Sequence, residues 1–274
     1  AVHFNKTTHP AGTKVKVFLS QTDGNYIPSA TIRKSVFFGL AASDMNGDGI
    51  TDLAIGHAIF KSNNFDITVT DFIRIWKGLG NGKFQAGLRK KSSRMEQLFA
   101  RDLNNDHLTD LIAVQSSGGG RPFFSTYFGQ GNGNLSSPSH YRRYPYPNAI
   151  DIADYNNDGH QDLGMVMRDK IRLFVGADGK FFNSLNLNVR NIGPTVGSGD
   201  LNGDGLIDIV TTRNIKKGHV RVFYGEPSGG YSPVDYPVKA FPSNVLVVDV
   251  NGDRKLDITV SYENSPLIST LYQN

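Results

Sequence analysis

The sequence predicts an all-β protein, a β-propeller of about six four-stranded blades, with five or seven blades as alternatives. Short bursts of aromatic and β-branched residues alternate with Gly, Asn, Asp and Pro, which is typical of folds with many short strands. A nine-residue Asp-rich motif occurs five times, with successive copies starting 58, 52, 46 and 49 residues apart. A repeat of that length predicts an array of like structural units.

Each repeat provides enough chain for one propeller blade. Apolar stretches lie on both sides of the Asp-rich motif, and a third stretch ends in a shared pattern, seen at residues 73–78, 125–129, 171–176 and 220–225. Four short antiparallel strands in about 50 residues make one blade. We therefore expect a single propeller domain over residues 1–274, with approximate repeats at 1–35, 36–93, 94–143, 144–189, 190–238 and 239–274.

The two ends of the chain hold incomplete repeats. Residues 1–35 contain a third-strand copy at 15–18 and a fourth at 26–27, but no Asp-rich motif. The last repeat stops after its third strand, at 267–272. Counting third strands predicts six blades, whereas counting motifs gives five.

Composition limits the class of protein. Hydrophobic residues make up 38% of the chain, enough for a core, and no apolar run approaches the 18 residues that would predict a membrane span. There is no cysteine, so disulfides contribute nothing. The start at Ala1 is expected either of a mature secreted protein or of a trimmed chain.

The Asp-rich motifs predict structural calcium sites. Asp, Asn and Asp at positions 1, 3 and 5 alternate along a tight turn, position 7 offers a carbonyl, and position 9 is Asp again, which suits the six to eight hard oxygen ligands of Ca²⁺. Turns without metal are the alternative, although clustered carboxylates repel unless a cation neutralises them. We expect up to five ions, held by Asp44, Asn46, Asp48, Asp52, Asp102, Asn104, Asp106, Asp110, Asp154, Asn156, Asp158, Asp162, Asp200, Asn202, Asp204, Asp208, Asp249, Asn251, Asp253 and Asp257.

Two of the five loops depart from the pattern at position 6. His107 and Arg254 replace the glycine found there in the other three, where the chain often needs a positive φ. We expect these two sites to be weaker than those beginning at Asp44, Asp154 and Asp200.

The charge balance predicts a basic surface outside the loops. The formal net charge is +4, but the loops contain 15 of the 25 acidic residues, which leaves 10 acids against 29 Lys and Arg, an excess of 19. Basic clusters occur at 89–94, at 141–146 and at 213–221. We expect all three in connections on the face opposite the calcium loops, where they would attract polyanions.

The far ends of the second strands predict a ligand site on that same face. Aligned from position 9, they should surround the mouth of a central channel. Together with the Tyr-Arg cluster they form our candidate ligand-binding set: His57, Gln115, Arg142, Arg143, Tyr144, Arg168, Arg213 and Tyr262. Tyr127, Tyr141, Tyr146 and Trp76 are further aromatic candidates, with Trp76 expected in the core.

The loops and the third-strand ends resemble the FG-GAP/VCBS repeat family, over nearly the whole chain. That family occurs in integrin α-subunit propellers, in a mushroom propeller lectin and in many secreted bacterial proteins. The resemblance implies a secreted, periplasmic or cell-surface protein. It also implies a binding module for carbohydrate, with acidic glycans favoured by the basic surface and nucleic acid unlikely.

An enzyme is the alternative function. Some propellers with such loops are polysaccharide lyases, which move protons with His and Tyr and neutralise a uronate carboxylate with Arg. Here His57 would be the base, Tyr262 the acid, and Arg168 and Arg213 the neutralising groups. The chemistry requires these groups to converge on one substrate, so no catalytic residue is assigned from sequence alone.

Overall fold

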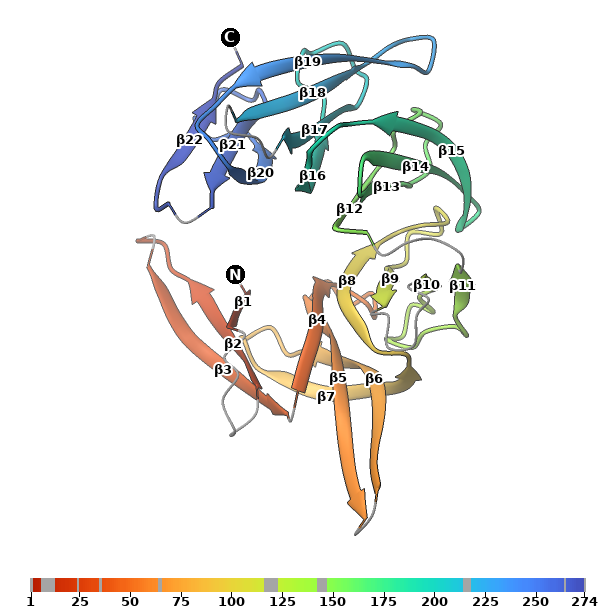
Figure 1. Ribbon diagram of the computed structural model, residues 1–274. Helices are drawn as coiled ribbons and strands as arrows, with labels where there is room; N and C mark the ends of the chain where they lie inside the picture. Colours follow the sequence, from red (N-terminus) through yellow and green to blue (C-terminus); the bar gives the residue numbers. More distant parts are fainter. Residues whose placement is uncertain are drawn as a thin grey trace. The chain divides into compact units, whose positions relative to one another are not determined.

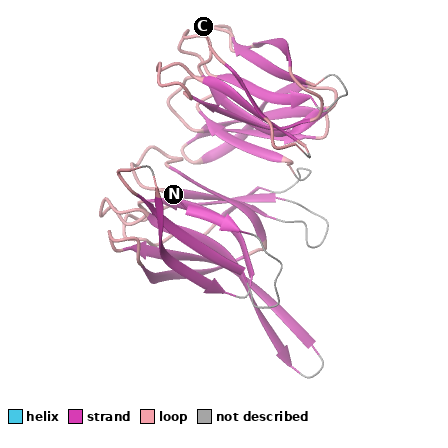
Figure 2. Ribbon diagram, turned by 90° about the vertical axis from the view of Figure 1, so that its left-hand side faces the viewer, coloured by secondary structure: helices cyan, strands magenta, loops and turns pink. Residues whose placement is uncertain are grey.

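The computed structural model describes residues 2–5, 13–23, 25–34, 36–63, 66–115, 123–141, 147–213, 218–263 and 265–273. These residues form strands, turns and loops, with no helix among them that is long and apolar enough to cross a membrane (Figure 2). The chain divides into two compact units, Ala1–Tyr146 and Pro147–Asn274. Each unit is described by itself.

Unit 1 contains three antiparallel sheets within its described residues (Figure 1). The first is β1(Val2–Asn5), β2(Thr13–Ser20) and β3(Tyr26–Lys34). The second is β4(Val36–Ser43), β5(Asp52–Asn63), β6(Asp66–Gly78) and β7(Phe84–Ser92). The third is β8(Met95–Arg101), β9(Asp110–Gln115), β10(Phe123–Tyr127) and β11(Ser139–Tyr141).

Unit 2 likewise contains three antiparallel sheets in the part that the structure describes. The first is β12(Ala149–Ala153), β13(Asp162–Met167), β14(Lys170–Ala177) and β15(Lys180–Asn188). The second is β16(Ile192–Gly199), β17(Asp208–Arg213), β18(His219–Gly225) and β19(Tyr231–Pro237). The third is β20(Pro242–Val248), β21(Asp257–Tyr262) and β22(Ile268–Leu271).

In all six sheets each strand pairs with its neighbours in sequence order. Every sheet lies within one of the expected repeat ranges, and the Asp-rich loops connect the first and second strands of five sheets. Two features differ from expectation. The N-terminal sheet has an additional strand, β1, paired with β2. The β5–β6 hairpin continues well beyond β4 and β7, as Figure 1 shows, so residues 59–63 and 66–70 form the two strands of an arm.

The cores lie between neighbouring sheets of each unit. Alternate residues of a strand point to opposite faces, and the third strands are apolar on the face toward the next sheet. Ile73 and Ile75 of β6 pack with Met95 and Leu98 of β8. Val220 and Val222 of β18 pack in the same way against the sheet that contains Val260. This alternation directs the intervening residues of each third strand, such as Arg74, toward the preceding sheet.

Candidate functional site

The five Asp-rich loops share one local geometry. In each, the position 1 carboxylate accepts the N–H of position 6 at 2.7–2.9 Å. The position 3 amide oxygen accepts the N–H of position 5 at 2.9–3.3 Å. The position 5 carboxylate accepts the N–H of position 7 at 2.8–2.9 Å. These Asx-type bonds curl the backbone around the three side chains.

The Asp at position 9 has a different role, because it is the first residue of the second strand and is buried. Asp162 illustrates the pattern: its Oδ2 accepts the N–H of Tyr155 at 2.9 Å, and its Oδ1 accepts the N–H of Gly176 at 2.7 Å. The same two bonds recur in the other four loops, at 2.7–3.1 Å. This carboxyl fastens the loop to the end of the third strand, while leaving lone pairs for a further partner.

The glycine that closes the third strand completes this attachment. The sequence shows this glycine at the end of the repeated third-strand pattern, but does not indicate which group its N–H binds. A Cβ at Gly78, Gly129 or Gly176 would overlap the carbonyl oxygen of loop position 8. Glycine therefore permits the close approach that brings its N–H to the buried Asp. In the last sheet Gln273 takes this place and donates to Asp257 at 3.1 Å.

Burial perturbs four of these carboxyl groups. It raises the pKa of Asp52 and Asp208 above the ordinary value, and raises the pKa of Asp110 and Asp162 to about 6, with neighbouring loop carboxylates acting in the same direction. Asp44 at position 1 differs: burial acts to raise its pKa, but backbone N–H groups, chiefly that of Gly49, bring it below the ordinary value. A cation would favour the charged form of every loop carboxylate.

The loops have a positive φ at both position 4 and position 6. The expectation for position 6 is confirmed even where glycine is absent, since His107 has φ 64° and Arg254 has φ 70°. Position 4 was not anticipated, and it is occupied by Gly or Asn, as at Asn105 with φ 61°. A left-handed conformation costs about 1–2 kcal/mol in a residue with a Cβ. His107 and Arg254 therefore impose a local cost on their loops.

The donor set of each loop fits a hard cation. Two or three carboxylates, an Asn oxygen and a backbone carbonyl are the oxygen ligands that Ca²⁺ prefers. Within the described residues, no three Asp, Glu or His side chains already converge as a metal site would require. In four loops the Asn amide instead donates to the position 5 carboxylate, at 2.9–3.1 Å. Calcium binding would therefore require small side-chain rotations.

The predicted ligand residues are distributed between the two units. His57 and Gln115 belong to unit 1, and Arg168, Arg213 and Tyr262 belong to unit 2. Arg142, Arg143 and Tyr144 lie outside the described residues, as does Tyr146. The central channel and the lyase assignment stay predictions, because they require residues of both units to converge.

Burial separates the candidates further. His57 is only 2% exposed, lies within β5 rather than at its end, and stacks on Phe72 with ring centroids 5.6 Å apart. Tyr262 is 6% exposed, and Gln115 and Tyr127 are fully buried. Buried side chains have little surface to offer a sugar. Among the predicted groups of the second-strand ends, Arg168 is exposed.

The basic clusters are also arranged differently from expectation. Arg89, Lys90 and Lys91 lie within β7, not in a connection between blades. They alternate between its two faces, and the Lys90 Nζ donates to the Leu135 carbonyl at 3.0 Å. In unit 2, Asp235 binds both arginines of the third cluster: Arg213 at 2.8 Å and Arg221 at 2.6 Å. Lys216 and Lys217 lie outside the described residues.

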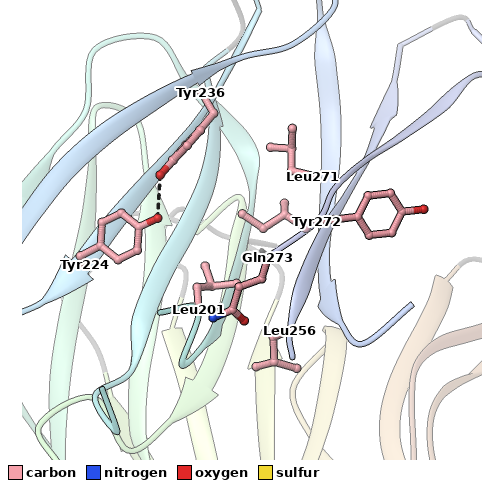
Figure 3. A pocket seen from close by; sticks show the side chains of 8 residues that line it. Leu201, Tyr224, Tyr236, Leu256, Leu271, Tyr272 and Gln273 are labelled. Atoms are coloured by element: carbon pink, nitrogen blue, oxygen red, sulfur yellow. Dashed lines mark hydrogen bonds between the residues drawn. The ribbon is translucent and has the colours of Figure 1, made fainter. Parts of the chain in front are cut away.

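A pocket of about 260 Å³ lies between the last two sheets of unit 2, near their Asp-rich loops (Figure 3). Tyr224 and Tyr236 of one sheet share a hydroxyl–hydroxyl hydrogen bond of 2.7 Å. Tyr272 directly follows β22 of the facing sheet, is 58% exposed, and turns its ring away from these two tyrosines in Figure 3. Gln273 adds an amide, and the remaining lining is Leu201, Leu256, Ile258 and Leu271. Burial raises the pKa of Tyr224, so its hydroxyl stays protonated and can donate.

A second pocket, of about 470 Å³, occupies the corresponding place in unit 1. It lies between β2 and the loop of the following sheet, and its lining includes Leu19, Thr51 and Gly78. These three residues have counterparts in the pocket of unit 2: Leu19 corresponds to Tyr224, Thr51 to Leu256 and Gly78 to Gln273. Both pockets are therefore on the loop side of their sheets, whereas the sequence predicted a ligand site on the opposite face.

Comparison with known proteins supports the repeat assignment. Residues 102–165 and 200–260 match the FG-GAP-like repeat family, and these two ranges include four of the five Asp-rich loops. The first loop, at 44–52, has the same hydrogen bonds as the other four. No curated protein matches the chain in sequence.

Solved structures show a likeness of fold. A proposed 6-phosphogluconolactonase from Bacteroides uniformis is 13% identical, with a TM-score of 0.51, over 98% of this chain and 90% of that one. A protein of the same description from Bacteroides fragilis is 12% identical, with a TM-score of 0.52, over 98% and 88%. At such identities the likeness concerns the fold alone. Residues 102–165 and 200–260 are therefore FG-GAP-like repeats, of a β-propeller family, as their Asp-rich loops predicted.

Proposed function

We propose that this chain is a calcium-stabilised β-propeller of about six blades that binds carbohydrate, with acidic glycans preferred, in a secreted, periplasmic or cell-surface setting. The tyrosine-lined pocket of unit 2 carries the proposal. Its volume, about 260 Å³, is just below the range of about 300–1,000 Å³ found for small-molecule sites. Apolar walls with a few hydroxyl and amide groups suit a sugar ring, which has an apolar face and a polar rim.

The preference for acidic glycans rests on charge. With five Ca²⁺ bound, the formal charge would rise from +4 to about +14, because each ion adds two charges. A basic surface attracts polyanions and speeds their association. Fifteen of the 25 acidic residues lie in the loops, so calcium and the basic surface are linked in this proposal.

The test is a glycan array read with calcium at low and moderate salt. Acidic glycans should bind, and should weaken with salt, since exposed charges are screened within about 8–10 Å at physiological ionic strength. Tyr272→Ala should weaken binding of sugars that occupy the pocket. Tyr26→Ala is the matched control, because Tyr26 in unit 1 is also 58% exposed. An array without any bound glycan would contradict the proposal, and salt-insensitive binding of neutral sugars alone would contradict the acidic preference.

A further inference from the structure

The β4–β7 sheet of unit 1 presents a row of aromatic and cationic side chains on one face. Phe72, Arg74 and Trp76 alternate along β6 and so share the face turned toward β2 and β3. Arg89 of β7 lies opposite Arg74 in the strand register. The Arg89 guanidinium carbon is 4.9 Å from the centre of the Phe72 ring, and that of Arg74 is 5.5 Å from the centre of the Trp76 ring. We call these four residues the arginine ladder.

The arginine ladder combines exposed and part-buried groups. Arg89 is exposed, whereas Phe72, Arg74 and Trp76 are half-buried. His57 lies opposite Phe72 on the neighbouring strand β5, and its buried ring stacks on the Phe72 ring and supports the orientation of that ring. The two guanidinium groups are therefore held against rings, which limits their motion, and exposed Arg89 keeps its N–H groups accessible.

Two arginines directly opposite each other are unfavourable in a sheet, because like charges repel. Among the described residues neither Arg74 nor Arg89 forms an ion pair, and the Nε of Arg74 is buried without a hydrogen-bond partner there. Asp71 does not neutralise this pair of arginines, because it lies three residues before Arg74 on β6 and so points to the other face of the strand. An unpaired buried donor costs about 1–3 kcal/mol.

The same third-strand position holds an arginine in two sheets of unit 2, and there the donor is paired. Arg172 of β14 lies opposite Asn186, whose Oδ1 accepts its Nε–H at 3.0 Å. Arg221 of β18 lies opposite Asp235, which accepts its Nε–H at 2.6 Å. In each of these sheets the fourth strand supplies the acceptor. In the β4–β7 sheet the fourth strand supplies Arg89 instead.

We infer that the acceptor missing from the arginine ladder is supplied by a ligand, and that the ladder is an anion-binding site for the carboxylate or sulfate groups of an acidic polysaccharide. Guanidinium groups bind such planar or tetrahedral oxyanions through paired N–H donors. The Phe72 and Trp76 rings provide apolar surface next to the anion, which suits a sugar that bears it. This inference rests on the proposed function for the polysaccharide class, but assigns the anionic contact to unit 1, whereas the tyrosine pocket belongs to unit 2.

Arg89→Asp is the most discriminating variant. It places a carboxylate opposite Arg74, as Asp235 is placed opposite Arg221, so the like-charge pair becomes an ion pair within the sheet. We expect it to raise the melting temperature while reducing binding of polygalacturonate and of dextran sulfate at least tenfold. A variant that merely damaged the fold would lower both quantities. Lys16→Asp is the matched control, because Lys16 is an exposed cation of unit 1 on β2 and the charge change is the same.

The outcomes separate this inference from the proposed function. Loss of binding in Arg89→Asp, with binding within about twofold of wild type in Lys16→Asp, supports the arginine ladder. Equal loss in both variants, or no loss in Arg89→Asp, overturns the ladder and leaves acidic-glycan binding intact. If the wild-type protein binds neither polymer, both proposals fail. Ladder-dependent binding of single-stranded DNA as tight as that of either polysaccharide would overturn the ligand class.

Discussion

Asp162→Ala tests whether the buried position 9 carboxyl holds the loop to its sheet. The substitution leaves the N–H groups of Tyr155 and Gly176 without their acceptors, which are now 2.9 and 2.7 Å away. An unsatisfied buried donor costs about 1–3 kcal/mol, so the two together should lower the free energy of unfolding by about 2–6 kcal/mol. Against a typical stability of about 5–15 kcal/mol, that loss is large.

Urea unfolding in EDTA at about pH 5 is the suitable assay, because burial raises the pKa of Asp162 to about 6 and the group is then mostly protonated. Asp162→Asn keeps one acceptor oxygen, so it should lose roughly half as much and remains measurable if the alanine variant fails to fold. Asp169→Ala, at an exposed position in the next hairpin, should change stability by less than about 0.5 kcal/mol. Equal stability of Asp162→Ala and Asp169→Ala would refute the reasoning.

Three further predictions concern the loops and the Asp235 ion pairs. His107→Gly and Arg254→Gly should each raise stability by about 1 kcal/mol, because glycine adopts their positive φ without strain, and thermal melting measures the gain. In EDTA the protein should lose stability as pH rises from about 4 to 7, because Asp110 and Asp162 have a folded pKa of about 6, above the unfolded value. Their contribution to the free energy of unfolding is fully present below the unfolded pKa and is lost as pH rises through 6, on the order of 3 kcal/mol each. Excess calcium should remove that slope. Asp235→Asn should destabilise at neutral pH, and because the Arg221 hydrogen bond lowers the pKa of Asp235, its difference from wild type should vanish as acid protonates the carboxyl.

The repeat and the loop geometry were predictable because both are local. The nine-residue spacing determines which side chains can bond to which N–H groups within a tight turn. Glycine at position 6 of three loops predicted a positive φ there, and the structure has a positive φ at His107 and Arg254 as well. The partner of each buried position 9 Asp was not predictable from its loop, because the second donor comes from a strand end 14 to 26 residues away.

The candidate ligand sites were harder to predict because they depend on strand register. A register shift between Arg74 and Trp76 places Arg89 opposite Arg74. Lys90 points to the other face because successive residues of β7 alternate, so the three consecutive basic residues do not form one patch. The sequence predicts His57 at a strand end, but β5 continues to Asn63 and the neighbouring residues bury the ring. The residue opposite each cation on the neighbouring strand, rather than the type of cation, determines whether it has an acidic partner.

Calcium binding by the Asp-rich loops is the central claim, and a crystal structure from crystals grown in saturating calcium, with anomalous data, tests it directly. We expect calcium bound by the side chains of positions 1, 3 and 5, at full occupancy in the loops that begin at Asp44, Asp154 and Asp200. The loops that begin at Asp102 and Asp249 should show lower occupancy, because His107 and Arg254 impose their strained position 6. Equal occupancy of all five would contradict that grading, and five loops without calcium would contradict the account itself.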